Sequence, residues 1–188
     1  MQQRFVTSQW VPYTVDVVFG FFINPHNLPL LMPERSLTRI ERLVLQQAPP
    51  NPLLPAADRA LVPASDGHEQ SEAAGVGSEI ELSFRPIPYL PMRVRWTARI
   101  TEFSWFSHFC DEQVRGPFRR FHHRHGIRAE MQQGRPGTRL SDEIDFELPM
   151  GKAGELWSGA VRGQLKRTFA MRQERLPKLL DGALRHNA

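Results

Sequence analysis

The stretch FRRFHHRHGIRAE, residues 118–130, contains three histidines and four arginines among a few apolar residues. Near neutral pH a histidine can act as a general base, a metal ligand or a hydrogen-bonding group. The stretch is typical of a β-strand, in which successive side chains point to opposite faces. Phe121 and Ile127 share the parity of His123 and His125, so we expect these two histidines on the buried face. The residues expected on the opposite face are Arg120, His122 and Arg124.

A later predicted strand, TRLSDEIDFEL at residues 138–148, places a carboxylate on its buried face. Its alternation separates a polar face from a mostly apolar one that contains a single acid, Asp142. The apolar face consists of Thr138, Leu140, Asp142, Ile144, Phe146 and Leu148. An aspartate beside a histidine orients the ring and makes it more basic, which suits proton abstraction.

Two further strands are predicted before these histidines. MRVRWTARI, residues 92–100, has the clearest alternation, with an apolar face of Met92, Val94, Trp96, Ala98 and Ile100. In WFSHFCDEQVR, residues 105–115, hydrophobicity alone does not choose between two candidate faces. One of them contains Trp105, Ser107, Phe109, Asp111 and Gln113, and the other contains Phe106, His108, Cys110, Glu112 and Val114.

The N-terminal part of the chain is predicted to form a strand and two short helical segments. Residues 3–11 alternate loosely, and Thr14 stands where the N-cap of a helix belongs. That helix should end at Asn24-Pro25, and the prolines of residues 24–33 leave room only for a short second helix or a turn. Residues 36–45 fit another strand.

The second half should be a run of strands followed by one long helix. Short connections between successive strands from residue 78 onward indicate an antiparallel meander. From about Glu155 an apolar residue recurs every four positions, as along one side of a helix. The members of this stripe are Trp157, Val161, Leu165 and Phe169. We expect Pro177 to bend or end the helix.

Residues 46–77 differ in composition from the rest, with five prolines, three glycines and no aromatic residue. Such a segment buries too little apolar surface to offset its ordering entropy. We therefore predict a long, mobile insertion between two strands; a lid over a cavity is the alternative.

The length of 188 residues fits a single domain over residues 1–188. The net charge is +4, but the arginines are scattered instead of gathered with stacking aromatics, so nucleic acid is not an expected partner. The longest apolar-rich stretch is interrupted by prolines and polar residues, and no signal peptide is recognisable, so we expect a cytoplasmic protein without stable membrane insertion. The single Cys110 cannot form an internal disulfide. The expected state is a monomer or homodimer.

The order of strand, two short helices, six antiparallel strands and long C-terminal helix resembles the helix-grip fold of the SRPBCC superfamily, which includes START domains, polyketide cyclases and pathogenesis-related allergens. Several positions resemble a pattern in bacterial cyclase/dehydrase-like members of unassigned function. They are Phe109, Asp111, Gln113, Gly116-Pro117, His123, His125, Gly137-Thr138, Asp142 and LPMG at residues 148–151. The resemblance covers nearly the whole chain.

The resemblance implies an α+β fold in which a curved sheet of six or seven strands grips the C-terminal helix around an apolar cavity. It also implies that Asp111 and Gln113 face inward. The expected ligand is a small hydrophobic molecule such as a lipid, isoprenoid, polyketide or aromatic compound. The expected binding residues are Trp96, Phe109, Asp111, Gln113, Phe121, His123, His125, Asp142, Trp157 and Val161. No cofactor is expected.

Buried polar side chains must be satisfied by one another, by water or by a ligand, since each otherwise costs about 1–3 kcal/mol. A self-satisfied network at the cavity floor is one interpretation, and a site for the polar group of a ligand is compatible with it. A cyclase or dehydratase with a His-Asp general base is the alternative function; its candidate catalytic residues are His123, His125, Asp111 and Asp142. A zinc site with His123, His125 and one aspartate is the least favoured interpretation.

Overall fold

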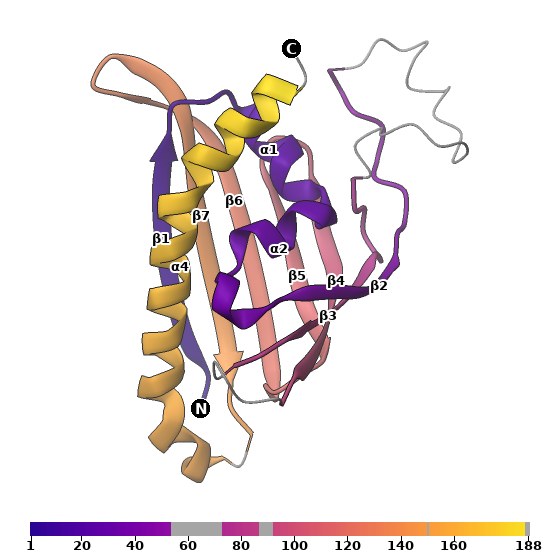
Figure 1. The fold of residues 1–188 in the computed structure, drawn as a ribbon, viewed down its shortest axis with the longest axis vertical. Helices are drawn as coiled ribbons and strands as arrows, with labels where there is room; N and C mark the ends of the chain where they lie inside the picture. Colours follow the sequence, from indigo (N-terminus) through magenta and orange to yellow (C-terminus); the bar gives the residue numbers. More distant parts are fainter. Residues whose placement is uncertain (54–72, 87–91, 150, 187–188) are drawn as a thin grey trace.

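The computed structural model describes residues 1–53, 73–86, 92–149 and 151–186. One antiparallel sheet of seven strands is covered on one face by the helices (Figure 1). The strands are β1 (Gln3–Val11), β2 (Arg39–Val44), β3 (Glu79–Phe84), β4 (Val94–Ser104), β5 (His108–Arg115), β6 (Arg120–Gln132) and β7 (Arg135–Glu147). The helices are α1 (Val15–Ile23), α2 (Leu28–Leu31) and α4 (Lys152–His186), with single 3-10 turns at Pro25–Asn27 and Glu34–Ser36.

The strand order is β1-β7-β6-β5-β4-β3-β2, so each strand from β2 to β6 pairs with the next one along the chain. The first strand is the exception, since β1 lies beside β7 at the far edge. The predicted meander and the two short helices after the first strand are confirmed. This is the helix-grip arrangement that the resemblance implies, with α4 lying across the sheet (Figure 1).

Alternation in β6 and β7 is regular over their central residues, where every second side chain is buried. His123 and His125 are 8% and 9% exposed, whereas His122 and Arg124 are less buried, as the sequence pattern predicts. The pairing places His125 opposite Asp142 on β7 and His123 opposite Asp111 on β5. The register therefore brings the four ionisable residues to one patch of the concave face.

The core consists of two apolar clusters that hold the helices against the sheet. One joins α1 and the last turns of α4 to the sheet and includes Phe19, Phe109, Leu176 and Leu180. The other lies under the middle of α4 and contains Phe121, Ile144, Phe146 and Phe169. Their aromatic rings pack mostly at tilted or edge-on angles, as for Phe5 and Phe169 at 5.4 Å between centroids.

Helix α4 does not end at Pro177, because it continues to His186. A proline cannot donate to the carbonyl four residues before it, which here is that of Gln173. The side chain of Gln9 on β1 supplies the missing donor, with its Nε2 at 2.7 Å from the Gln173 carbonyl oxygen. The strand thus satisfies the group that the proline leaves open, and the helix passes through.

The predicted mobile insertion at residues 46–77 falls mainly on residues 54–72, which lie outside the described residues. The described residues at its two ends make backbone contacts. Gln47 forms an isolated bridge with Ala74, whose backbone N–H donates to the carbonyl of Ile23 at 3.1 Å. A side chain at Gly75 would lie 2.4 Å from the Gln47 carbonyl oxygen, so this close approach needs glycine.

Docking of α4 on the sheet can be tested with two leucines one turn apart. Leu180 is fully buried, whereas Leu184 is 42% exposed. We expect Leu180→Ala to lower the free energy of unfolding in urea by about 2–5 kcal/mol, because it leaves a cavity in the core. Leu184→Ala should change it by less than about 0.5 kcal/mol. Equal effects of the two substitutions would contradict the packing of this end of the helix.

Candidate functional site

A cavity of about 390 Å³ lies between the sheet, the short helices and α4. Most of its wall is apolar and aromatic, and it is built by elements that are far apart in sequence. The larger side chains of the wall are Phe21, Phe22, Leu82, Phe84, Trp96, Ile100, Phe109, Phe118, Phe121, Ile144, Leu165 and Phe169. The polar side chains among the lining residues include Asp111, His123, His125 and Arg172. The interior of the protein is thus hollow, and Asp111, His123, His125 and Arg172 gather on one part of its wall, while Arg85, directly after β3, is a further ionisable lining residue.

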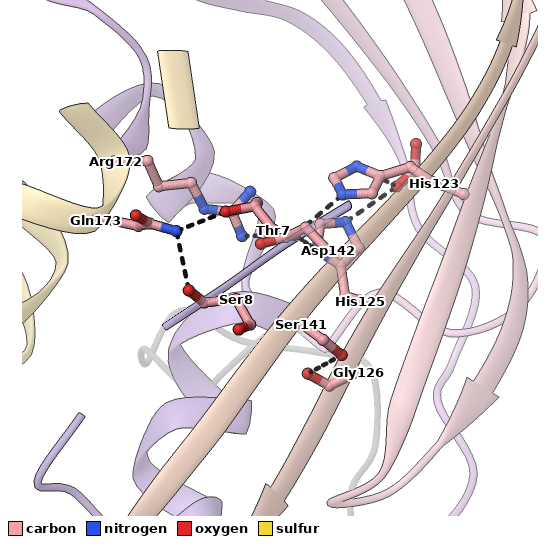
Figure 2. Close-up of polar contacts among 10 residues, drawn as sticks. Thr7, Ser8, His123, His125, Gly126, Ser141, Asp142, Arg172 and Gln173 are labelled. Carbon is pink, nitrogen blue, oxygen red and sulfur yellow. Dashed lines mark hydrogen bonds and ion pairs between the residues drawn. The ribbon is translucent and has the colours of Figure 1, made fainter. Parts of the chain in front are cut away.

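The two histidine rings lie side by side on β6, with 3.8 Å between their centroids. Asp142 of β7 is on one side of the pair and Asp111 of β5 is on the other. Figure 2 shows Asp142 between the histidines and Arg172, which reaches in from α4. Each imidazole therefore has a carboxylate near both of its nitrogens.

His123 is anchored through one nitrogen. Its Nε2 makes a 3.0 Å hydrogen bond with Asp142 Oδ1. Its Nδ1 is 3.8 Å from Asp111 Oδ2, which is beyond hydrogen-bonding distance. The ring is thus oriented by Asp142, and its second nitrogen remains on the side of Asp111.

His125 contacts both carboxylates, but in different ways. Its Nε2 is hydrogen-bonded to Asp111 Oδ2 at 3.2 Å. Its Nδ1 is 3.0 Å from Asp142 Oδ1, yet the ring N–H does not point at that oxygen, so we regard this contact as electrostatic and not as a hydrogen bond. The face of the ring stacks on Phe109 with 4.2 Å between centroids and an interplanar angle of 18°. Packing on Phe109 fixes the plane of the imidazole.

Arg172 supplies the positive charge nearest to Asp142 from the helical side. One guanidinium nitrogen is 3.4 Å from Asp142 Oδ1, and only 11% of the arginine side chain is exposed. The guanidinium carbon also lies over two rings, 4.6 Å from the centroid of Phe22 and 5.2 Å from that of Phe169. Such cation–π contacts compensate part of the lost hydration. Arg172 therefore links α4, α1 and the sheet at one point.

The pKa values of both carboxyls are lowered in spite of their burial. Burial alone would raise the pKa of Asp142, but the charge of Arg172 and the contacts with the two histidines outweigh it and hold the pKa well below the usual value. Burial also acts to raise the pKa of Asp111, and there the hydrogen bond from His125 and the charges of the histidines prevail. Both aspartates are therefore ionised at neutral pH.

The two histidines differ in basicity. The pKa of His123 is lowered because burial disfavours the charged ring and the positive charge of His125 repels it. Burial acts in the same direction on His125, but its contacts with Asp111 and Asp142 outweigh burial and raise its pKa. His125 is thus the preferred proton carrier, and His123 is the neutral ring. With His125 protonated, the charges of Asp111 and Asp142 are balanced by those of His125 and Arg172.

The structure places most of the predicted binding residues on the cavity wall. They are Trp96, Phe109, Asp111, Phe121, His123, His125 and Val161. Asp142 is not part of the wall; it lies behind the histidines and supports them. Its role is therefore to orient the residues that line the cavity.

Two predicted binding residues lie elsewhere. Gln113 turns its amide to the backbone of Phe118, donating to the carbonyl at 2.7 Å and accepting from the N–H at 3.2 Å, so it closes the turn between β5 and β6. Trp157 is 69% exposed and does not line the cavity. Figure 1 shows the first turns of α4 extending past the ends of the strands.

Arg172 is a residue of the site that the sequence analysis did not single out. The signal was present, since Arg172 lies three residues after Phe169 and four before Leu176. Residues at this spacing share one face of a helix. An apolar helical face interrupted by a single arginine would have indicated a buried partner for that arginine.

Two groups of side chains among the described residues have the composition and closeness of metal ligands. Asp111, His123 and His125 form one of them, on the cavity wall. Glu102, Cys110 and His122 form the other, with the parity of the outer face. In each group one ligand atom from every residue lies within 4.8 Å of the others.

Comparison of the sequence with family models and with curated proteins gives no match. Comparison of the structure gives matches over nearly the full length. TTHA0849 from Thermus thermophilus has a TM-score of 0.61 at 13% identity, covering 96% of this chain and 99% of its own. A Thalictrum norcoclaurine synthase mutant in complex with a transition-state analogue has a TM-score of 0.58 at 11% identity, covering 100% and 98%. Major latex-like protein 151 of Panax ginseng has a TM-score of 0.55 at 10% identity, covering 94% and 96%.

At such low identities these likenesses establish the fold, which is the helix-grip fold. The expectation drawn from the sequence resemblance is confirmed at that level. Together, the fold and the cavity define a helix-grip protein with a hollow interior and an ionisable wall. None of the helices in the described part of the chain is long and apolar enough to cross a membrane.

The supporting role of Asp142 can be measured as stability. Asp142→Asn keeps the shape but removes the charge that faces His123, His125 and Arg172. We expect a loss of about 3–5 kcal/mol in the free energy of unfolding, because buried partners are left uncompensated.

Asp145→Asn on the same strand is the matched control, because its side chain has the opposite parity. It should cost less than about 1 kcal/mol. Chemical denaturation of both variants measures the two losses in the free energy of unfolding. Similar losses would mean that the charge of Asp142 stabilises the protein no more than that of Asp145.

Proposed function

We propose that the protein binds a small hydrophobic molecule with at least one polar group in the cavity between the sheet and α4. The observation that carries this proposal is the cavity itself. Ligand sites in proteins usually occupy about 300–1,000 Å³ and combine apolar walls with a few placed polar groups. A cavity of about 390 Å³ with aromatic walls and one ionisable patch agrees with both features.

The nature of the wall supports a ligand whose bulk is apolar. Phe21 and Phe22 of α1, Trp96 of β4 and Phe121 of β6 line the same space. Burying apolar ligand surface there is worth about 25 cal/mol per Å² before the costs of association. A lipid, isoprenoid, polyketide or aromatic compound fits this description.

The ionisable patch supports a polar group at one end of the ligand. Its charges balance internally, so a neutral donor or acceptor enters at lower cost than an isolated charge. His123 Nδ1 and Asp111 both lie at the cavity wall and can accept a hydrogen bond. A hydroxyl or phenol on the ligand suits these acceptors. The norcoclaurine synthase match, in complex with a transition-state analogue, supports a ligand-binding role for this fold.

Binding can be tested with the fluorescent probe 1-anilinonaphthalene-8-sulfonate. The wild-type protein should bind it saturably with one site. Ala98→Trp places a large side chain on the cavity wall, so we expect at least a tenfold loss of affinity. Thr97→Trp, on the neighbouring position with the opposite parity, should bind the probe as the wild type does.

Native mass spectrometry of protein purified without detergent, followed by organic extraction, identifies any natural ligand. Its absence from Ala98→Trp and presence in Thr97→Trp would support the cavity as its site. Equal probe binding by both variants would mean that the cavity is not the binding site.

A second candidate function is proton transfer in a cyclisation or dehydration. The geometry of His123 favours it, because Asp142 holds Nε2 while Nδ1 makes no hydrogen bond with Asp111 at 3.8 Å. A neutral ring that is oriented by a carboxylate can act as a general base toward a substrate in the cavity.

The two functions are separated by His123→Gln once a ligand has been extracted. A general base predicts at least about 100-fold slower turnover of that compound with unchanged affinity. His125→Gln is the comparison, because it removes the neighbouring ring that already carries a proton. If the wild type does not turn the compound over and His123→Gln binds it more weakly, His123 serves recognition alone.

A further inference from the structure

We propose that Asp111, His123 and His125 form a binding site for a divalent transition-metal ion of the zinc or ferrous type, with at least one coordination position open to the cavity. The sequence analysis favoured this interpretation least, and the side-chain geometry now supports it. The metal-binding step does not depend on the proposed function. Only the use of the metal as an anchor for the polar group of a cavity ligand rests on it.

The three ligand atoms are already spaced for one metal ion. Asp111 Oδ2 is 3.2 Å from His125 Nε2 and 3.8 Å from His123 Nδ1. In a tetrahedral zinc site with bonds of about 2.0–2.1 Å, neighbouring nitrogen and oxygen ligands are about 3.3 Å apart. Small rotations of the side chains are enough to place all three around one ion. Two imidazoles and one carboxylate suit zinc or ferrous iron.

The second nitrogens of the rings support the same assignment. A histidine bound to a metal usually donates its other N–H to a carboxylate, which fixes the tautomer and the ring orientation. Asp142 Oδ1 stands 3.0 Å from both His123 Nε2 and His125 Nδ1. Asp142 thus stands behind both rings and is hydrogen-bonded to His123 Nε2, while His123 Nδ1 and His125 Nε2 are the nitrogens that approach Asp111.

The charges divide in a way that suits a cation at Asp111. Arg172 contacts Asp142 and not Asp111, so the supporting carboxylate already has a positive partner. The contacts of Asp111 are with the two histidines, which would bind the ion together with it. All three proposed ligands line the cavity, whereas Asp142 and its hydrogen bonds lie behind them. With three protein ligands, a fourth position remains for water or for an oxygen of the cavity ligand.

The outer-face group of Glu102, Cys110 and His122 is the competing site. Arg124 lies within it, with one guanidinium nitrogen 3.2 Å from Glu102 Oε2 and 3.7 Å from Cys110 Sγ. A fixed positive charge beside the donors opposes a cation. The cavity group has no such charge directed at Asp111 among the contacts of the described residues, so it is the better site.

The test is a titration of the full-length, tag-free and chelator-treated protein with Co²⁺, followed by visible absorption, and with Zn²⁺ in competition with a chelating dye. We expect one equivalent to bind. His125→Gln and Asp111→Asn should each lower the affinity more than about 100-fold, and Asp142→Asn about 10- to 100-fold, as for a second-layer carboxylate. His122→Gln and Cys110→Ser, on the outer face, should change it by less than about twofold.

The spectrum of the wild-type Co²⁺ form distinguishes the two groups without any substitution, in case a cavity variant does not fold. Binding in the cavity predicts a paramagnetically shifted ring N–H proton signal from His123, whose Nε2 is hydrogen-bonded to Asp142, and no thiolate-to-cobalt charge-transfer band. Addition of azide should change the visible bands if a position is open.

Each other result overturns part or all of the proposal. No saturable binding by the wild type, a thiolate band, or loss of binding in His122→Gln would refute the cavity metal site. Binding with no response to azide would refute the open position. The sulfonate probe reports on the metal-free cavity. If the probe binds but the metal does not, only the metal site is refuted. If the metal binds but the probe does not, only the proposed function is refuted.

Discussion

The structure depends on the burial of two ionised carboxylates next to two histidines under a long helix. An isolated carboxylate loses far more hydration energy than the folding of a small domain can supply, so each must have compensating partners. Asp142 has three of them on different elements, two histidines on β6 and Arg172 on α4. The position of α4 over the sheet is therefore constrained by a charge requirement as well as by apolar packing.

The hollow interior follows from how that requirement is met. Arg172 extends from α4 to Asp142 on the sheet and passes the rings of Phe22 and Phe169. At this point the separation between α4 and the sheet is about the length of an arginine side chain. The apolar clusters lie on two sides of this contact, one with α1 and the end of α4, the other under the middle of α4. Neither cluster fills the space beside the ionisable patch. A core of leucine at the same positions would have closed it, as protein interiors generally pack without voids.

The sequence predicts the parts of this structure that depend on local periodicity. The burial of His123, His125 and Asp142 follows from strict alternation with large apolar neighbours, and these positions are as expected. The side of Asp111 does not follow from alternation, because both faces of β5 contain apolar and polar residues; only the family resemblance selects it. Gln113 has the right parity, but the turn before Phe118 uses its amide, and such a contact is not visible in a pattern.

The features of α4 that periodicity does not show have a different physical origin. A helix can continue through a proline when another group satisfies the exposed carbonyl, and Gln9 on the far edge strand does so for Gln173. That interaction joins residues more than 160 positions apart, so no local signal contains it. Trp157 follows the apolar period of the helix but is exposed. Arg172 was missed because an arginine on an apolar stripe is unusual unless a buried acid faces it.

The contacts of Asp111 and Asp142 with the two histidines and Arg172 also bear on what the cavity could bind. Asp111 and Asp142 find their partners within the protein, in His123, His125 and Arg172. The Asp111 carboxylate contacts His125 Nε2, and both would be ligands of the proposed metal ion. A metal ion would therefore bind in place of a proton on that nitrogen. A neutral polar group requires no such exchange, since His123 Nδ1 makes no hydrogen bond with Asp111. The two proposed occupants would therefore use adjacent atoms of one wall, next to the ring that Asp142 orients.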